Sequence, residues 1–226
     1  MRPPTIVAIG GLSSEVGKTT VMCDLLSALG GWEAIKTTRG HYRSCGKDPH
    51  TCCVSHLLSD EPVIRSGREE TYSPGKDTGR YWEAGATNVH WLIATEEQVE
   101  QGIKLALERV KGTAVLVEGN SFTEFTSVDF MLMVTRAEGG KIKGSARRAL
   151  PRVSAFYLSE PAGSLSGTDS AKARASANDP TAQQRFAAWR ADTQLNELHS
   201  DVPIYTRADL PRLVTELQQI HQALAA

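Results

Sequence analysis

The sequence predicts a three-layer α/β fold, in which a mainly parallel β-sheet carries helices on both faces. Short apolar runs alternate along the chain with segments of helical spacing. The runs are apolar at successive positions, as in strands that are buried on both faces, and such strands with intervening helices form parallel sheets. At 226 residues and 40% hydrophobic content the chain can form a substantial core, so we expect a single domain over residues 1–226.

The first half of the chain supplies three expected strands and two expected helices. Residues 5–9 (TIVAI) form the first strand, and a helix extends from about Gly17 to Leu29. Residues 33–36 (EAIK) and 88–94 (NVHWLIA) form the next two strands, and a helix follows from about Glu96 to Val110. The strands are short and apolar, whereas the helices carry apolar residues at helical spacing.

The second half supplies four expected strands and a terminal helix. The strands are residues 113–119 (TAVLVEG), 129–134 (DFMLMV), 153–158 (VSAFYL) and 202–206 (VPIYT). The terminal helix is expected to begin with Asp209 as its N-cap and with Pro211 in its first turn. Its apolar positions at helical spacing are Leu210, Val214, Leu217, Ile220 and Leu224.

Residues 37–75 interrupt this alternation. The stretch contains Pro49, Pro62 and Pro74 with several glycines, and it shows no clear periodicity. It is too long for an ordinary connection between two elements, and such segments are usually functional loops. We therefore expect a long irregular insertion within the single domain.

The charge balance argues against several classes of partner. Lys and Arg number 25 and Asp and Glu number 26, so no bulk electrostatic field favours nucleic acid or an anionic membrane. No apolar stretch approaches the ~20 residues that cross a bilayer, and the N-terminal apolar run leads into a loop rather than a cleavage site. We expect a soluble, cytoplasmic protein whose ligand is recognised at a local site.

A glycine-rich loop joins the first strand to the first helix. Residues 10–20 (GGLSSEVGKTT) place Gly-Lys-Thr at the start of the helix, with five residues between Gly11 and Gly17, where the usual phosphate-binding loop has four. The backbone N–H groups and the positive end of the helix would surround phosphates, Lys18 would add a charge, and the Thr19 hydroxyl would bind Mg²⁺. The expected nucleotide-binding residues are Gly11, Ser13, Ser14, Glu15, Val16, Gly17, Lys18, Thr19 and Thr20.

A carboxylate ends the strand of residues 113–119. Glu118 stands at the carboxyl end of that strand, and phosphates bind at this edge of open α/β sheets. It is expected to bind Mg²⁺, directly or through water, or to orient a reacting water molecule. Together with the glycine-rich loop, Glu118 predicts nucleotide hydrolysis or transfer, with ATP or GTP and Mg²⁺ as the ligands.

The loop resembles that of dethiobiotin synthetases. Those enzymes carry the same five-residue spacing and the same Glu-Val-Gly-Lys-Thr ending that residues 15–19 show here. The resemblance implies the broad class of P-loop NTPases of the SIMIBI type. That class also holds the molybdopterin-guanine dinucleotide biosynthesis adaptor family, MobB, and the GTPases of nickel-enzyme maturation.

The middle of the chain is more similar to the MobB family. Residues 33–42 (EAIKTTRGHY) resemble its second strand, residues 73–94 resemble its Pro-Gly-Lys-Asp-Ser segment and following strand, and VLVEG resembles its acidic strand. The resemblance implies a GTP-binding protein that assists nucleotide attachment to molybdopterin. It makes Asp77 a catalytic residue and Mg²⁺ ligand, although Asp77 is equally suited to cap a helix. Lys36 is either a phosphate or substrate contact or a solvated strand end.

A cluster of cysteines and histidines lies in the insertion. Cys45, His50, Cys52, Cys53 and His56 fall within twelve positions, and their thiolates and imidazoles suit Zn²⁺ or Ni²⁺. The spacing matches no established zinc finger. Free cytosolic thiols in a loop are an equally good interpretation.

Three functional hypotheses remain open at this stage. The first is a Mg²⁺-dependent NTPase similar to MobB, acting with a partner enzyme of cofactor biosynthesis. The second is a nucleotide-switched metallochaperone or adaptor that uses the Cys/His loop, and the third is a ligase similar to dethiobiotin synthetase. The resemblance implies a homodimer. The basic segment of residues 141–150 is interpreted as a solvated helix face, with a contact to phosphates or to an acidic partner as the alternative.

Overall fold

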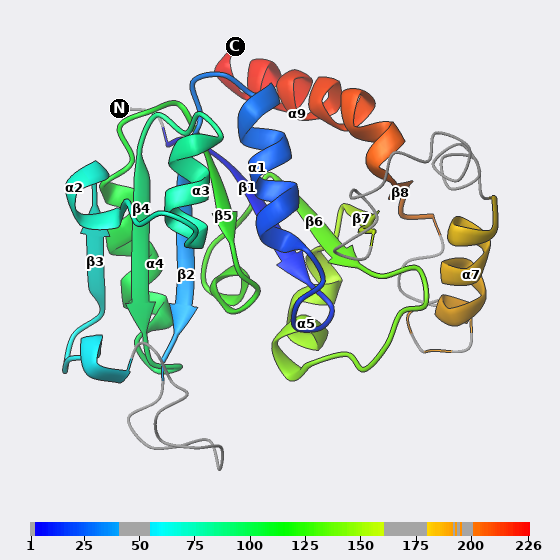
Figure 1. The fold of residues 1–226 in the computed structure, drawn as a ribbon, viewed down its shortest axis with the longest axis horizontal. Coiled ribbons are helices and arrows are strands. Elements are labelled where there is room, and N and C mark those ends of the chain that lie inside the picture. Colours follow the sequence, from blue (N-terminus) through cyan, green and yellow to red (C-terminus); the bar gives the residue numbers. More distant parts are fainter. Residues whose placement is uncertain (1–2, 41–54, 161–179, 192, 194, 196–200) are drawn as a thin grey trace.

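The computed structural model describes residues 3–40, 55–160, 180–191, 193, 195 and 201–226 (Figure 1). They contain an eight-stranded sheet of order β3-β4-β2-β5-β1-β6-β7-β8, in which only the β3–β4 pair is antiparallel. The strands are β1 Thr5–Gly11, β2 Glu33–Arg39, β3 Val63–Ser66, β4 Val89–Ala94, β5 Ala114–Glu118, β6 Phe130–Thr135, β7 Ala155–Leu158 and β8 Ile204–Tyr205. The predicted three-layer α/β fold is confirmed.

Helices cover both faces of the sheet, as Figure 1 shows. The main helices are α1 Lys18–Ala28, α3 Asp77–Glu83, α4 Val99–Glu108, α5 Gly144–Ala149, α7 Pro180–Ala191 and α9 Leu210–Ala225. Val7 and Ile9 of β1 join one core with residues of α1, α3 and α9, whereas Ile6 and Ala8 join a second core with residues of α4, α5 and α7. Successive residues of a strand point to opposite faces, so β1 is apolar throughout because both of its faces are buried.

The order of the strands brings distant residues together at the carboxyl edge. β5 lies between β1 and β2, with Ile9 and Lys36 both in register with Glu118. The end of β1, which leads into the glycine-rich loop, therefore adjoins the acidic end of β5 directly. The site described below lies at this edge.

The prediction of an irregular insertion over residues 37–75 is wrong for much of the part that the structure describes. Residues 37–39 continue β2, a 3-10 turn covers Ser55–Leu57, and β3 and the short helix α2 (Arg68–Thr71) follow. β3 is not predicted from the sequence because its four residues are too few to show an alternation of apolar and polar positions. Its pairing with β4 is also non-local. Residues 41–54 lie outside the described part of the chain.

One helix boundary and one helix cap differ from expectation. The helix expected from Glu96 begins at Val99. Asp209 stands at the N-cap position of α9 but makes no side-chain hydrogen bond to that helix. Its carboxylate instead accepts hydrogen bonds from the backbone N–H and the hydroxyl of Thr206, at 2.9 and 2.8 Å, and completes a capping box around the preceding 3-10 turn. None of the described helices is long and apolar enough to cross a membrane.

A buried polar network joins three strands near the opposite, amino edge of the sheet. Glu33 is 3% exposed, and its carboxylate lies 2.8 Å from His90 Nε2 and accepts the N–H groups of Lys111 and Gly112 at 2.9 and 2.5 Å. His90 Nδ1 lies 2.9 Å from the Ser66 hydroxyl. Burial works against the charged carboxylate, but the bonds from His90 and the two amides hold the pKa of Glu33 below its usual value.

Replacing Glu33 with glutamine is expected to lower the free energy of unfolding by ~1–3 kcal/mol at pH 7, because a buried charged acceptor is lost. The lowered pKa stabilises the fold above the unfolded-state pKa, and this contribution disappears as the pH falls through the folded-state pKa. The difference between the two proteins should therefore narrow below about pH 4.5. Urea unfolding at several pH values measures it, with Glu108→Gln on the exposed face of α4 as the control. A difference independent of pH would contradict the assignment.

Candidate functional site

The loop between β1 and α1 is held by left-handed residues and by two outside donors. Gly17, at the N-cap position of α1, has φ 87°, a conformation that glycine adopts without strain, and Glu15 has φ 56°. The side chain of Val16 is buried in the core. Arg136 Nη2 donates to the carbonyl of Glu15 at 3.1 Å, and the Ser159 hydroxyl donates to the carbonyl of Val16 at 2.5 Å.

The start of the loop packs against β5. A Cβ atom at Gly11 would lie 2.9 Å from both Lys18 Cδ and Val16 Cγ2, so a larger residue there would displace these side chains. The backbone of Gly11 donates to Asn120 Oδ1 at 2.8 Å and accepts from Asn120 Nδ2 at 3.0 Å. Asn120 was not identified from sequence, although it stands only two residues beyond Glu118.

The remaining loop residues differ in position. Ser14 lines the cavity described below, and the Ser13 hydroxyl donates to the carbonyl of Ser14 at 3.4 Å. Thr20 is exposed on α1 and does not line the cavity. The side chains of Lys18 and Thr19 follow Gly17 and turn toward the end of β5, where both approach Glu118.

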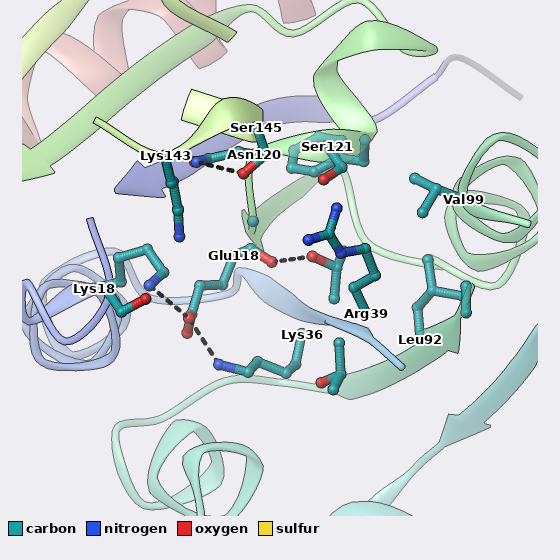
Figure 2. A pocket seen from close by; sticks show the side chains of 16 residues that line it. Lys18, Lys36, Arg39, Leu92, Val99, Glu118, Asn120, Ser121, Lys143 and Ser145 are labelled. Atoms are coloured by element: carbon teal, nitrogen blue, oxygen red, sulfur yellow. Dashed lines mark hydrogen bonds and ion pairs between the residues drawn. The ribbon is translucent and has the colours of Figure 1, made fainter. Parts of the chain in front are cut away.

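Glu118 is the centre of a charged cluster, drawn in Figure 2. Its side chain is 4% exposed, with Lys36 Nζ 2.7 Å from Oε1 and Lys18 Nζ 3.8 Å from the same oxygen. Lys36 Nζ also lies 2.7 Å from Asp77 Oδ2. The structure therefore joins residues 18, 36, 77 and 118, and the interpretation of Lys36 as a solvated strand end is wrong.

Two hydroxyl groups complete the contacts of Glu118. Thr19 Oγ1 donates to Oε2 at 3.3 Å, and the hydroxyl of the fully buried Tyr81 donates to the same oxygen. Burial and the adjacent Glu118 carboxylate raise the pKa of Tyr81 well above its usual value, so the tyrosine remains a neutral donor. Tyr81 was missed in sequence, but it stands four residues after Asp77 on α3 and hence on the same helix face.

Asp77 acts as part of this cluster and not as a helix cap. It is the first residue of α3, whereas Lys76 occupies the N-cap position without a side-chain hydrogen bond. Burial would raise the pKa of Asp77, but the Lys36 ammonium lowers it below the usual value. Burial would lower the pKa of Lys36, but Glu118 and Asp77 together raise it. Asp77 and Lys36 are therefore both charged at neutral pH.

The oxygen atoms at this position fit Mg²⁺. The Thr19 hydroxyl and the carboxylates of Glu118 and Asp77 are hard oxygen donors, which Mg²⁺ prefers. The Lys36 ammonium lies 2.7 Å from an oxygen of each carboxylate, so these two side chains already face one cation together. Thr19, Glu118 and Asp77 are thus the residues that could hold the metal.

A cavity of about 400 Å³ extends from the loop across the carboxyl edge. Its polar lining includes Arg39 from β2 and Lys143, which precedes α5. Burial lowers the pKa of Lys143 to about 8, and repulsion from Lys18 and Arg39 adds to this shift. The interpretation of residues 141–150 as a solvated face holds for exposed Lys141 and Arg147 but is wrong for Lys143.

The Cys/His cluster lies mostly outside the described residues. Cys45, His50, Cys52 and Cys53 fall in the segment 41–54, and the described member, His56, is exposed in a 3-10 turn. Within the described ranges, no group of three or more His, Cys, Asp or Glu side chains is arranged to hold a metal ion. The carboxylate site above would therefore depend on further oxygen donors from a bound ligand or water.

Removing a donor that holds the β1–α1 loop should loosen the loop and, under the function proposed below, weaken triphosphate binding. We expect Arg136→Ala to lower triphosphate affinity by several-fold. The carbonyl of Glu15 loses a charge-assisted hydrogen bond worth ~1.5–3 kcal/mol, and only part of that energy contributes to holding the loop in its binding conformation. Amide hydrogen exchange of residues 13–17 should accelerate in the nucleotide-free variant. Exposed Arg147→Ala is the matched control. Unchanged exchange in Arg136→Ala would contradict the positioning role.

The fold and this loop define an α/β protein of the P-loop NTPase fold. HypB from Helicobacter pylori in complex with nickel has a similar structure, with a TM-score of 0.51 and 12% identity over 98% of this chain and 88% of that one. LpxK from Aquifex aeolicus in complex with ATP matches with a TM-score of 0.45 and 17% identity over 69% of this chain and 48% of that one. The ATP complex of a McdA variant from Cyanothece matches with a TM-score of 0.44 and 11% identity over 100% and 98%. No protein-family model and no curated protein sequence matches the chain.

Proposed function

We propose that this chain is a single-domain NTPase that binds magnesium GTP or ATP at the β1–α1 loop and hydrolyses it. The observation that carries the proposal is the convergence of Lys18 and Thr19 on Glu118. Lys18 Nζ and Thr19 Oγ1 lie 3.8 and 3.3 Å from its two carboxylate oxygens. A phosphate-binding lysine, a hydroxyl and a carboxylate are the parts that phosphoryl transfer requires.

Each residue has a separate task in this proposal. The N–H groups of residues 13–20 and the positive end of α1 bind the phosphates, and Lys18 adds its charge to the β- and γ-phosphates. Thr19, Glu118 and Asp77 would hold Mg²⁺, which would neutralise charge on the phosphate oxygens. Lys36 holds Asp77 and Glu118 in place through its two 2.7 Å contacts. No protein atom needs to bond to phosphorus, so the rate would come from positioning and charge stabilisation.

The pathway proposal rests on the resemblance to the MobB family. The segments that carry the resemblance supply Lys36, Asp77 and Glu118, and these three residues form one ion-paired cluster. We therefore propose GTP or ATP hydrolysis that assists nucleotide attachment to the molybdenum cofactor, together with a partner enzyme and as a homodimer. A nucleotide-dependent gain in nucleotide attachment by that partner enzyme tests this role, and the absence of any gain would exclude it.

A second candidate is an enzyme that transfers the terminal phosphoryl group to a second substrate, as a ligase of the dethiobiotin-synthetase type does. The observation in its favour is that the cavity extends beyond Ser14 and Lys18 of the loop to residues of β2 and β4 and to Lys143 and Ser145. Steady turnover that depends on an added small acid or amine would support it. Tight nucleotide binding with negligible turnover would instead support an adaptor.

Ligand-dependent thermal stability tests nucleotide binding. We expect one or more of ATP, GTP and CTP, each with Mg²⁺, to raise the melting temperature. A ligand at a hundred times its Kd stabilises the native state by about 2.7 kcal/mol, which is readily measured. The same titration without Mg²⁺ should give a smaller shift. If no magnesium triphosphate stabilises the protein, the proposed function is wrong.

A further inference from the structure

The cavity reaches well beyond the part that phosphates would occupy. Only Ser14 and Lys18 of the β1–α1 loop line it, whereas most of its wall comes from the ends of β2, β4 and β5 and from residues 143–145. Figure 2 shows Lys143 and Arg39 entering from opposite sides, with Ser121 and Ser145 between them. This second part of the cavity, which we call the distal subsite, is lined by Arg39, Ser121, Lys143, Ser145, Leu92 and Val99.

The distal subsite carries uncompensated positive charge. Lys143 is half-buried, and no carboxylate of the described residues lies within ion-pair distance of its ammonium group. Arg39 pairs with Glu96 at 3.2 Å, but this exposed carboxylate is shared with Arg148 at 3.0 Å. Glu118 is already contacted by Lys36 and Lys18. Lys143 and Arg39 therefore both face the cavity, and their one carboxylate partner in the described part of the chain, Glu96, is shared with Arg148.

Hydroxyl groups and apolar side chains complete the lining. Ser145 Oγ accepts from Asn120 Nδ2 at 3.5 Å, which leaves its own proton available. The hydroxyl of Ser121 makes no hydrogen bond to any other described residue. Leu92 and Val99, from β4 and α4, form the apolar side of the cavity. Cations and free hydroxyl donors beside an apolar wall match an anionic group attached to a short apolar body.

We propose that the distal subsite binds a small organic anion, through its phosphate or carboxylate group, as the second substrate of the NTPase. The anionic group contacts Arg39 and Lys143, and the hydroxyls of Ser121 and Ser145 donate to it. Its apolar body lies against Leu92 and Val99. The inference deepens the proposed function and rests on it for the identity of the first substrate. The pKa of Lys143 is lowered to about 8, as expected for a half-buried ammonium group that has no carboxylate partner among the described residues of the ligand-free protein.

The test uses inorganic phosphate, acetate and butyrate as probes. Each is titrated by calorimetry into nucleotide-free protein and into protein saturated with Mg²⁺ and a non-hydrolysable triphosphate, with saturation confirmed by melting temperature. We expect a probe to bind in both states. Lys143→Met and Arg39→Met should each weaken this binding by about tenfold or more, the usual loss for one charge-assisted hydrogen bond. Lys141→Met removes the same charge from an exposed position two residues away and should leave the binding unchanged.

The outcomes separate the subsite from the nucleotide site. Whichever of phosphate and acetate binds more tightly identifies the anionic group of the substrate. Butyrate that binds more tightly than acetate, by about fourfold per methylene, supports the apolar contact. Probe binding that vanishes once the triphosphate analogue is bound, or that is insensitive to Lys143→Met, would overturn the subsite and leave nucleotide binding intact. If no triphosphate binds, the proposed function fails, while probe binding that requires Lys143 still supports the anion site. If no probe binds in either state, the subsite is wrong.

Discussion

Replacing Lys18 with alanine is expected to remove most of the thermal stabilisation that a magnesium triphosphate gives to the unaltered protein. Lys18 is the cation nearest to the N-terminus of α1, and its Nζ atom already turns toward Glu118, 3.8 Å away. A charge-assisted hydrogen bond is worth ~1.5–3 kcal/mol, so the affinity should fall by roughly a hundredfold. At the ligand concentration that stabilises the wild type by about 2.7 kcal/mol, the variant would gain only about 0.4 kcal/mol.

The same experiment distinguishes lost binding from lost folding. Lys18 contacts Glu118 only at 3.8 Å, whereas Lys36 approaches that carboxylate to 2.7 Å, so the nucleotide-free variant should keep its melting temperature. Lys141→Ala, an exposed change in a neighbouring loop, should leave the full triphosphate response. A Lys18→Ala protein that responds to triphosphate as the wild type does would show that the β1–α1 loop is not the nucleotide site.

Replacing Glu118 with glutamine should separate turnover from binding. The substitution keeps the size of the side chain but removes the charge that Lys36, Thr19 and Tyr81 all contact. We expect hydrolysis to fall by ~10²–10³-fold, as for loss of one preorganised electrostatic contact, while triphosphate binding persists through Lys18 and the loop amides. Single-turnover hydrolysis and the thermal shift measure the two effects.

The Glu118 variant should also be less stable without nucleotide. Lys36 is only 16% exposed and would retain Asp77 alone as its acidic partner, so we expect a loss of ~1–3 kcal/mol in the free energy of unfolding. Glu124→Gln, which removes a partly exposed partner of Arg148, is the control for a general loss of charge. Hydrolysis at the wild-type rate in Glu118→Gln would exclude a catalytic role for this carboxylate.

Local signals were sufficient for part of the site. The glycine-rich loop could be predicted because a strand, the residues GKT and a helix follow one another within one short segment. Glu118 could be predicted because the end of a parallel strand has a known edge of the sheet. Tyr81 could have been added from its spacing to Asp77. β3 could not, since four residues show no period and its pairing lies in another segment.

Charge alone did not predict which basic residues line the cavity. Lys141 and Lys143 are two positions apart and chemically identical, yet one is exposed and the other faces the cavity. The local sequence does not show which of the two lysines is exposed and which lines the cavity, because burial depends on where the following helix packs. The same holds for Lys36, whose two carboxylate partners come from α3 and β5.

By itself, the sequence determined the alternation of strands and helices, the glycine-rich loop between β1 and α1 and the acidic end of β5, because each depends on residues close together in the chain. Only the tertiary structure decided that β5 lies between β1 and β2, and with that order the meeting of Lys36, Asp77 and Glu118. The order of strands in a sheet depends on backbone pairing between distant segments and on helices that must cover both faces. Neither of these requirements leaves a local pattern in the sequence.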